Sequence, residues 1–155
     1  MRGMRWVLAL IVLGAVLAAG GRAASAQSCS VTTTPVSFGS YDVFTSTDLP
    51  STGSIRYQCA NLSWSTLTVY LSKGSAASNN PRQMVSGANR LNYNLYLDAA
   101  HTQIWGDPNP NSYSQFYWGA GGNPNVTLTV YGLIPALQDV ATGSYTDSVT
   151  ATVNF

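Results

Sequence analysis

The sequence predicts an all-β fold, an immunoglobulin-like Greek-key β-sandwich. Several segments alternate apolar and polar residues with the two-residue period of a strand. Stretches rich in Gly, Asn and Pro separate these segments, as expected for turns. The chain contains no Glu, whereas Thr and the aromatic residues suit pleated strands. About seven short strands are typical of a sandwich, although the same pattern also fits a barrel.

The first 26 residues have the pattern of a secretory signal peptide. Two arginines precede an uncharged run over 7–19, and Ala24-Ser25-Ala26 is a small-x-small cleavage site. The run is shorter than the roughly 20 residues that a membrane-spanning helix needs, which makes a retained anchor the weaker interpretation. We expect cleavage after Ala26, leaving residues 27–155 as one exported domain without a membrane span.

The strands expected first along the domain lie at 29–36, 54–59 and 67–71. Residues 38–42 should form a turn, and 45–52 a polar loop. In the second and third strands every second residue is apolar, so Ile55 and Tyr57, like Leu67 and the residues that alternate with it, should face the core.

The remaining strands are expected at 91–97, 126–134 and 143–155, with a short one at 115–118. The segment 91–97 has a clean apolar face of alternating Leu and Tyr, opposite a polar face that includes Asn92 and Asn94. Loops are expected at 72–80 and through most of 105–125, because Gly, Asn, Pro and Ser dominate there.

The last expected strand is the most regular of all. Its apolar face carries Tyr145, Asp147, Val149, Ala151, Val153 and Phe155. Ser, Thr and Asn occupy the alternate positions. A further strand beside it would have to come from elsewhere in the chain or from another molecule.

Cys29 and Cys59 are the only cysteines. In an exported chain such a pair is expected to form one disulfide, which would fasten the N-terminal strand to the domain. Closing a loop of about 30 residues would stabilise the fold by roughly 3 to 4 kcal/mol. A redox or metal-binding pair is the weaker alternative, because a CxxC spacing and a neighbouring His are missing.

The charge of the expected domain argues against a nucleic-acid partner. The expected exported domain carries four Lys and Arg residues and six Asp residues, a formal charge of −2. It has no basic cluster, so we do not expect nucleic-acid binding. Proteins, surfaces or sugars are the expected partners.

Catalytic, cofactor and metal motifs are not recognisable in the sequence. His101, the sole histidine, follows a turn pattern and is expected to be a solvated loop residue. Asp98 and Asp107 flank Trp105 and are the best carboxylate pair for a glycosidase, but Asp in turns usually caps backbone groups. We therefore expect a protein that is not an enzyme and needs no cofactor.

Aromatic residues gather in a loop-rich region and allow two interpretations. Trp105, Tyr117 and Trp118 could stack on sugar rings or adhere to apolar surfaces if they are exposed. The favoured alternative is that Phe116 and Trp118 alternate with Tyr117 on a strand and fill the core.

Ordered sequence blocks along the domain show a family resemblance. The blocks are Phe38-Gly39-x-Tyr41, Arg82-Gln83-Met84, Leu91-x-Tyr93-x-Leu95-Tyr96-x-Asp98, Trp105-Gly106-Asp107, Tyr131-Gly132-x-Ile134-Pro135, Gln138 and Gly143-x-Tyr145-x-Asp147-x-Val149 with Val153-x-Phe155. Together they resemble the spore coat protein U domain. That domain is shared by secreted bacterial coat proteins and by subunits of archaic chaperone-usher pili.

This resemblance implies an incomplete immunoglobulin-like domain that lacks its final strand. A periplasmic chaperone would fill the open groove first, and the N-terminal extension of a neighbouring pilus subunit would replace it at the outer-membrane usher. One side of the groove would consist of Val149, Ala151, Val153 and Phe155. The other side would be the first strand near Cys29, and the C-terminal carboxylate of Phe155 would contact the chaperone.

Only Gln27 and Ser28 precede Cys29 after the expected cleavage. A donor segment needs roughly ten extended residues with alternating apolar side chains. We therefore expect a subunit that accepts a strand at a fibre end, as a tip or minor subunit, on a surface fibre for adhesion and biofilm formation. The alternatives are a secreted spore-coat or surface-coat protein that forms no pili, and a carbohydrate-binding adhesin.

Overall fold

The computed structural model describes residues 25–107 and 113–155, and all regular structure in them is β-strand. The strands are β1 (Ser28–Thr34), β2 (Leu49–Ala60), β3 (Leu62–Leu71), β4 (Arg82–Ser86), β5 (Asn89–Tyr96), β6 (Gln115–Gly122), β7 (Asn125–Ile134) and β8 (Ala151–Asn154). The predicted signal peptide falls almost wholly outside the described residues.

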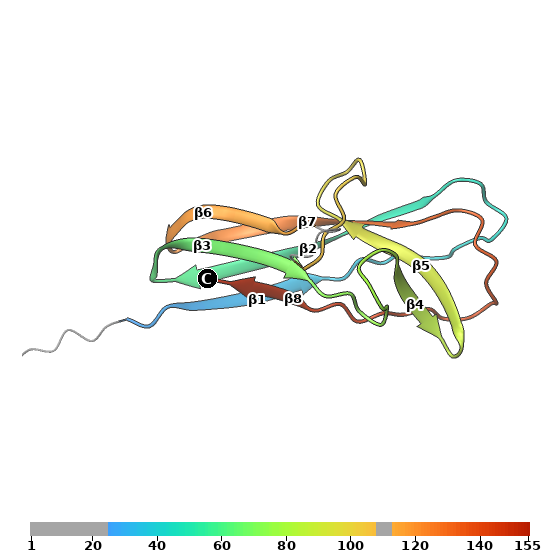
Figure 1. The fold of residues 1–155 in the computed structure, drawn as a ribbon, viewed down its shortest axis with the longest axis horizontal. Coiled ribbons are helices and arrows are strands. Elements are labelled where there is room, and N and C mark those ends of the chain that lie inside the picture. The colour runs from blue at the N-terminus through green and yellow to red at the C-terminus, as the bar shows by residue number, and fades with distance from the viewer. Residues whose placement is uncertain (1–24, 108–112) are drawn as a thin grey trace, which may run out of the picture.

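Two antiparallel sheets face each other along an elongated molecule (Figure 1). The larger sheet has the strand order β1-β2-β7-β5-β4, and the smaller one has the order β6-β3-β8. Strands that are neighbours in a sheet are often distant in sequence, as β2 and β7 are. This arrangement confirms the predicted all-β, immunoglobulin-like sandwich.

The core lies between the two sheets and is built from the inward faces that the alternation predicted. Leu67, Val69 and Leu71 of β3 are buried, as are Leu91, Tyr93 and Leu95 of β5 and Ile55 and Tyr57 of β2. Asn94 is an exception, since it was expected to face solvent but is buried. Its Oδ1 accepts a hydrogen bond of 2.9 Å from Nη1 of the buried Arg82, which satisfies both groups.

The second strand is longer than predicted. Residues 49–52 were expected to be loop, because their residues are mostly polar and include Pro50. In the structure they pair with β7, where Leu49 lies opposite Ile134 and Pro50 opposite Leu133. Pairing with a long partner strand has overridden the weak local propensity.

The C-terminal segment differs from the single long strand that was expected. Only Ala151–Asn154 form a ladder, with β3. Upstream, Thr146 forms an isolated bridge with Val85 of β4, through N–H···O bonds of 2.8 and 3.1 Å. The segment therefore crosses from the edge of the larger sheet to the edge of the smaller one. The predicted alternation persists, since Tyr145 and Val149 are half-buried and their neighbours are exposed.

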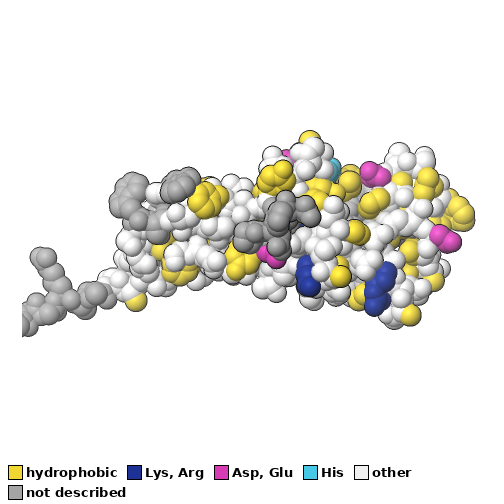
Figure 2. Space-filling model, in the orientation of Figure 1, with side chains coloured by type: hydrophobic (Ala, Val, Ile, Leu, Met, Phe, Trp, Pro, Cys, Tyr) yellow, Lys and Arg dark blue, Asp and Glu magenta, His cyan; other side chains and the backbone are white. Residues whose placement is uncertain are grey.

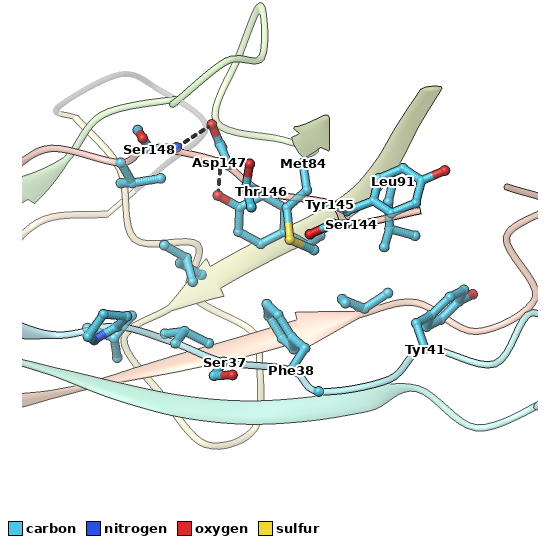
Figure 3. A pocket seen from close by; sticks show the side chains of 18 of the residues that line it. Ser37, Phe38, Tyr41, Met84, Leu91, Ser144, Tyr145, Thr146, Asp147 and Ser148 are labelled. Carbon is cyan, nitrogen blue, oxygen red and sulfur yellow. Dashed lines mark hydrogen bonds between the residues drawn. The ribbon is translucent and has the colours of Figure 1, made fainter. Parts of the chain in front are cut away.

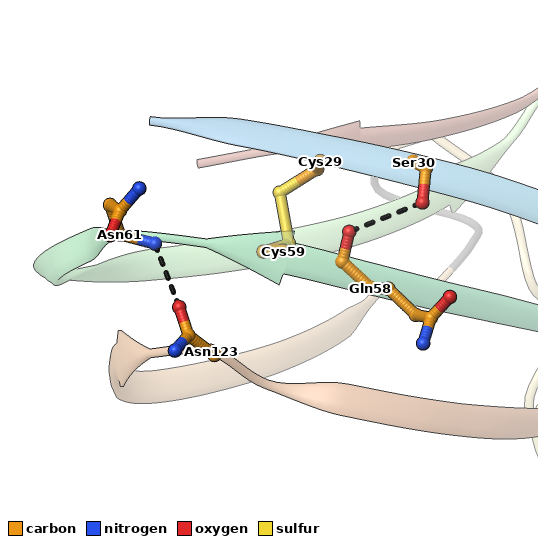
Figure 4. The surroundings of a disulfide bond; sticks show 6 residues. All are labelled: Cys29, Ser30, Gln58, Cys59, Asn61 and Asn123. Atoms are coloured by element: carbon orange, nitrogen blue, oxygen red, sulfur yellow. Dashed lines mark hydrogen bonds between the residues drawn. A yellow bond between two sulfur atoms is a disulfide. The ribbon is translucent and has the colours of Figure 1, made fainter. Parts of the chain in front are cut away.

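A disulfide joins β1 to β2 (Figure 4). Cys29 and Cys59 lie directly opposite each other in the ladder, and their sulfur atoms are 2.07 Å apart. Apart from Cys29, the side chains of β1 are exposed. The ladder with β2 and this covalent bond therefore hold β1 at the edge of the larger sheet.

Candidate functional site: a groove between two extended segments

A groove of about 1230 Å³ opens between two extended segments that are not part of the strands (Figure 3). We call residues 35–43, which follow β1, the first wall, and residues 140–149, which precede β8, the second wall. Apart from the bridge of Thr146 to β4, neither wall belongs to a ladder among the described residues. The walls face each other across the groove.

The floor of the groove is the apolar core of the sandwich. It consists of side chains from both sheets, namely Ile55, Leu71, Met84, Leu91, Tyr93, Leu95, Val130 and Ile134. Most of these residues are nearly inaccessible to water even with the groove empty. A segment lying in the groove would complete their burial and would meet mainly hydrocarbon.

Two glycines allow the first wall to lie close to the larger sheet. A Cβ atom on Gly132 of β7 would lie 2.6 Å from Cγ1 of Val36 and 2.8 Å from Cζ of Phe38. A Cβ atom on Gly53 of β2 would likewise lie 2.9 Å from Cγ2 of Val36. The Phe38 ring also packs edge-to-face on Tyr93, with ring centroids 6.0 Å apart. The first wall thus lies close to the larger sheet for two reasons: the glycines leave room for its side chains, and its apolar side chains contact the sheet.

Asp147 fastens the second wall to the floor (Figure 3). Its carboxylate accepts hydrogen bonds from the Tyr93 hydroxyl at 2.7 Å and from the Ser75 amide at 2.8 Å. A Cβ atom on Gly74 would lie 2.1 Å from Oδ2 of Asp147, so this carboxylate needs a glycine beside it. Burial, together with the bond to Asp147, raises the pKa of Tyr93 and keeps its hydroxyl protonated as a donor.

The charged side chains among the described lining residues of the groove are all acidic. Among its described lining residues, Asp42 and Asp147 are the ionisable carboxylates, and no Lys, Arg or His is present. The Oδ1 atom of Asp42 accepts a bond of 2.9 Å from the Phe44 amide. The groove therefore suits an apolar segment that is neutral or basic, and it disfavours an acidic one.

The expected groove residues fall into two groups. Val149 and Ala151 line the groove, whereas Val153 and Phe155 lie beyond it. Val153 pairs with Val69 of β3, and Phe155 is 48% exposed. The opposite side also differs from the expectation, because it is the segment after β1 and not the strand near Cys29.

Sequence reasoning missed the first wall because 38–42 were expected to form a turn. A usable signal was present in the alternation of Val36 and Phe38 beyond the end of the strand. Both side chains are half-buried in the structure, and the residues between and beside them are exposed.

The hypothesis of an adhesive aromatic cluster is wrong for Trp105. This residue is only 1% exposed, and its Nε1 donates a bond of 3.0 Å to the Val69 carbonyl. The ring belongs to the apolar core, and the Trp105 amide donates a bond of 2.8 Å to the Leu95 carbonyl of β5. Tyr117 is half-buried and packs edge-to-face on Tyr57, whereas the side chain of Trp118 lies outside the described residues. Phe116, expected in the core, is 44% exposed, because β6 turns the face that carries Tyr117 toward the core.

Asp98 and His101 serve local structure. The Asp98 carboxylate accepts bonds from the amides of Thr102 and Gln103 at 3.1 and 2.8 Å, which is the capping role that the sequence suggested. Desolvation alone would raise the pKa of Asp98, but these hydrogen bonds outweigh it and lower the pKa. His101 adopts a φ of 55° in the turn and packs edge-to-face on Tyr96.

Asp107, the other candidate carboxylate, accepts a hydrogen bond from the Asn79 side-chain amide. Within residues 25–107 and 113–155, no group of three or more His, Cys, Asp or Glu could hold a metal ion. Nor does this part of the chain contain a helix long and apolar enough to cross a membrane.

Comparison with known proteins agrees with the fold and the sequence blocks. Residues 14–152 match the Spore Coat Protein U domain. Protein U of Myxococcus xanthus is 34% identical over 131 residues, which cover 77% of this chain and 71% of that protein.

A solved structure has the same fold. It is the CsuC–CsuE chaperone–tip adhesion subunit pre-assembly complex from archaic chaperone-usher Csu pili of Acinetobacter baumannii, matched with a TM-score of 0.54 and 23% identity. The match covers 84% of this chain and 40% of that chain. By its sequence match over nearly the whole domain, this chain belongs to the Spore Coat Protein U domain family.

Proposed function

We propose that the protein is an exported structural subunit of a surface fibre, and that its groove accepts an extended segment of another protein chain. The observation that carries the proposal is the pairing of two walls outside the ladders with an apolar floor between them. A third extended segment could hydrogen-bond to the walls and place alternate side chains on the floor. This is strand addition to an incomplete sandwich.

The burial of apolar side chains favours the binding of an extended segment in the groove. Extended segments whose backbone groups lack ladder partners, like the two walls, are prone to aggregation. Each Val or Leu side chain that an inserted segment buries contributes about 1.5 to 3 kcal/mol before the cost of ordering the segment. A segment with several such residues would therefore bind tightly.

The structural neighbour suggests the partners. That protein is a tip adhesion subunit captured with its chaperone. By analogy, a periplasmic chaperone would occupy the groove after export, and a subunit segment would replace it at an outer-membrane usher. The mature protein would then reside on the cell surface and contribute to adhesion and biofilm formation. A position at the fibre end, as a tip or minor subunit, remains a prediction.

A coat subunit that forms no pilus is the second candidate, favoured by the match to the Spore Coat Protein U domain. The gene neighbourhood discriminates between the two. Adjacent chaperone and usher genes support the pilus, whereas their absence favours the coat.

The groove is tested with a synthetic peptide of about 12 residues in which Val and Thr alternate between terminal lysines. Titration calorimetry would measure its binding to the oxidised protein purified from a bacterial periplasm. A peptide of the same composition in shuffled order is the control. We expect binding of the alternating peptide alone.

Two neighbouring arginine variants locate the binding site. Val149→Arg places a bulky cation on the groove side of the second wall, and Thr150→Arg places it on the next residue, which is exposed and does not line the groove. Val149→Arg should weaken binding at least tenfold, and Thr150→Arg should leave it nearly unchanged. Equal affinities for both variants would place the peptide elsewhere and contradict the proposal.

A further inference from the structure

We propose that the Tyr41 hydroxyl joins the two sides of the groove at one end and fixes their separation, which makes Tyr41 a positioning residue for the bound segment. The inference rests on the proposed function, since it concerns the affinity of the same groove. Tyr41 belongs to the first wall, and its side chain lies opposite Tyr145 of the second (Figure 3).

The hydroxyl makes two hydrogen bonds of opposite direction. It donates to the Pro135 carbonyl at 2.9 Å and accepts from the Gln138 amide at 2.8 Å. Pro135 and Gln138 belong to the turn that leads from β7 into the second wall. Among the described residues, no other hydrogen bond connects the first wall to residues 135–149.

The turn that Tyr41 contacts is itself firmly held. The Gln138 side chain accepts a hydrogen bond from the Asn92 amide at 2.8 Å and donates one to the Asn92 carbonyl at 2.8 Å. It therefore pairs with both backbone groups of Asn92, as the backbone of a neighbouring strand would. The Ala136 amide donates to Asp48 at 2.9 Å. Between them, Leu137 adopts a φ of 56°, which a branched residue rarely adopts without support from its surroundings. Tyr41 thus connects the first wall to a fixed point on β5.

A fixed separation matters because an inserted strand must hydrogen-bond to both walls at once. Neighbouring strands lie about 4.8 Å apart, so a change of 1 Å in the separation would spoil one row of bonds. Walls held apart in advance spare the incoming segment the cost of ordering them. Loss of the Tyr41 hydroxyl should therefore reduce affinity more than it reduces stability.

Tyr145 provides a matched control. It is also a half-buried tyrosine that lines the groove, and its hydroxyl donates a bond of 2.7 Å to the Ala141 carbonyl. Both partners of this bond lie in the second wall. Tyr145→Phe therefore removes a hydrogen bond at the groove without disconnecting the two sides.

The test compares Tyr41→Phe with Tyr145→Phe by titration of the alternating Val/Thr peptide, and by urea unfolding without peptide. Both substitutions should lower the free energy of unfolding by similar amounts. Tyr41→Phe should bind the peptide about tenfold more weakly than the wild type and clearly more weakly than Tyr145→Phe, which loses a hydrogen bond within one wall only. Equal weakening in both variants would overturn the role of Tyr41.

A measurement without peptide separates this inference from the proposed function. Amide hydrogen exchange at Gln138 and along the first wall should accelerate in Tyr41→Phe and stay near the wild-type rate in Tyr145→Phe, whose lost bond lies within the second wall. Unchanged exchange in Tyr41→Phe would overturn the connection between the walls. A wild-type protein that binds no alternating peptide would contradict the proposed function, whatever the exchange rates.

Discussion

At the scale of single residues, Arg82 is the most deeply buried charged residue in the part of the chain that the structure describes, with 0% exposure. It donates to the Ser72 carbonyl at 3.0 and 2.9 Å and to the Trp105 carbonyl at 2.7 Å. With the bond to Asn94, it ties two loops to β5. Burial lowers the pKa of Arg82, and nearby Tyr93 and the carboxylates partly offset this effect.

We expect Arg82→Met to lower the free energy of unfolding by about 3 kcal/mol or more, because several buried oxygens would lose their donor. Arg90→Met is the control, since Arg90 is exposed and bonds only to nearby turn carbonyls. It should change stability by about 0.5 kcal/mol or less. Urea unfolding at neutral pH measures both, and similar small losses would contradict this account of the buried charge.

Two buried tyrosines make stability depend on alkaline pH. Desolvation, aided by Tyr117, raises the pKa of Tyr57 from 10.0 to about 12, and burial also raises the pKa of Tyr93. Above pH 10.0 the unfolded chain ionises these groups while the folded protein keeps them neutral. Their stabilising contribution is therefore complete below pH 10.0 and is lost as the pH rises toward about 12.

The measurement is urea unfolding across this alkaline range, with tyrosinate absorbance recorded in parallel. The unfolding midpoint should fall with rising pH, and Tyr57→Phe should flatten the fall. A wild-type midpoint that stays constant up to pH 12 would show that Tyr57 ionises equally in both states.

At the scale of secondary-structure elements, β1 depends on few interactions. It pairs only with β2, and apart from Cys29 its side chains are exposed. The disulfide to Cys59 therefore supplies much of what keeps β1 in the sheet. Since the first wall continues directly from β1, the bond also supports one side of the groove.

Replacing both cysteines by Ser should cost roughly 3 kcal/mol of stability in the chain-entropy model. Amide exchange should accelerate first in β1 and the first wall, and only later in β3 and β5. Ser30→Ala serves as the control, because it removes only a hydrogen bond of 3.4 Å between the same strands. Uniform acceleration across all strands would instead mean that the disulfide stabilises the whole domain equally.

The elements also show what the sequence could and could not predict. Alternation correctly predicted the buried faces of β3 and β5, because a two-residue period specifies which side chains share a face. It could not predict the pairing of 49–52 with β7 or the burial of Trp105, since both depend on distant partners. The resemblance predicted Val149 and Ala151 as groove residues, whereas the first wall was missed because 38–42 were expected to form a turn.

At the scale of the whole molecule, the described part of the sandwich combines a weakly charged exterior with an apolar groove. Figure 2 shows few charged groups on the face in view, where hydrophobic side chains lie scattered among uncharged ones. The groove opens between the two walls onto apolar side chains from both sheets. In the function proposed above, an extended segment of a partner chain would fill this groove.

The most direct test of this account is thermal unfolding of the oxidised protein, alone and with the alternating Val/Thr peptide. A ligand that binds only the folded form stabilises it by about 2.7 kcal/mol at a hundredfold excess over Kd, which should raise Tm by several degrees. The shuffled peptide should leave Tm unchanged, and Val149→Arg should abolish the rise. A high, cooperative Tm that ignores the alternating peptide would mean that the domain is complete by itself, and would contradict the groove as an acceptor site.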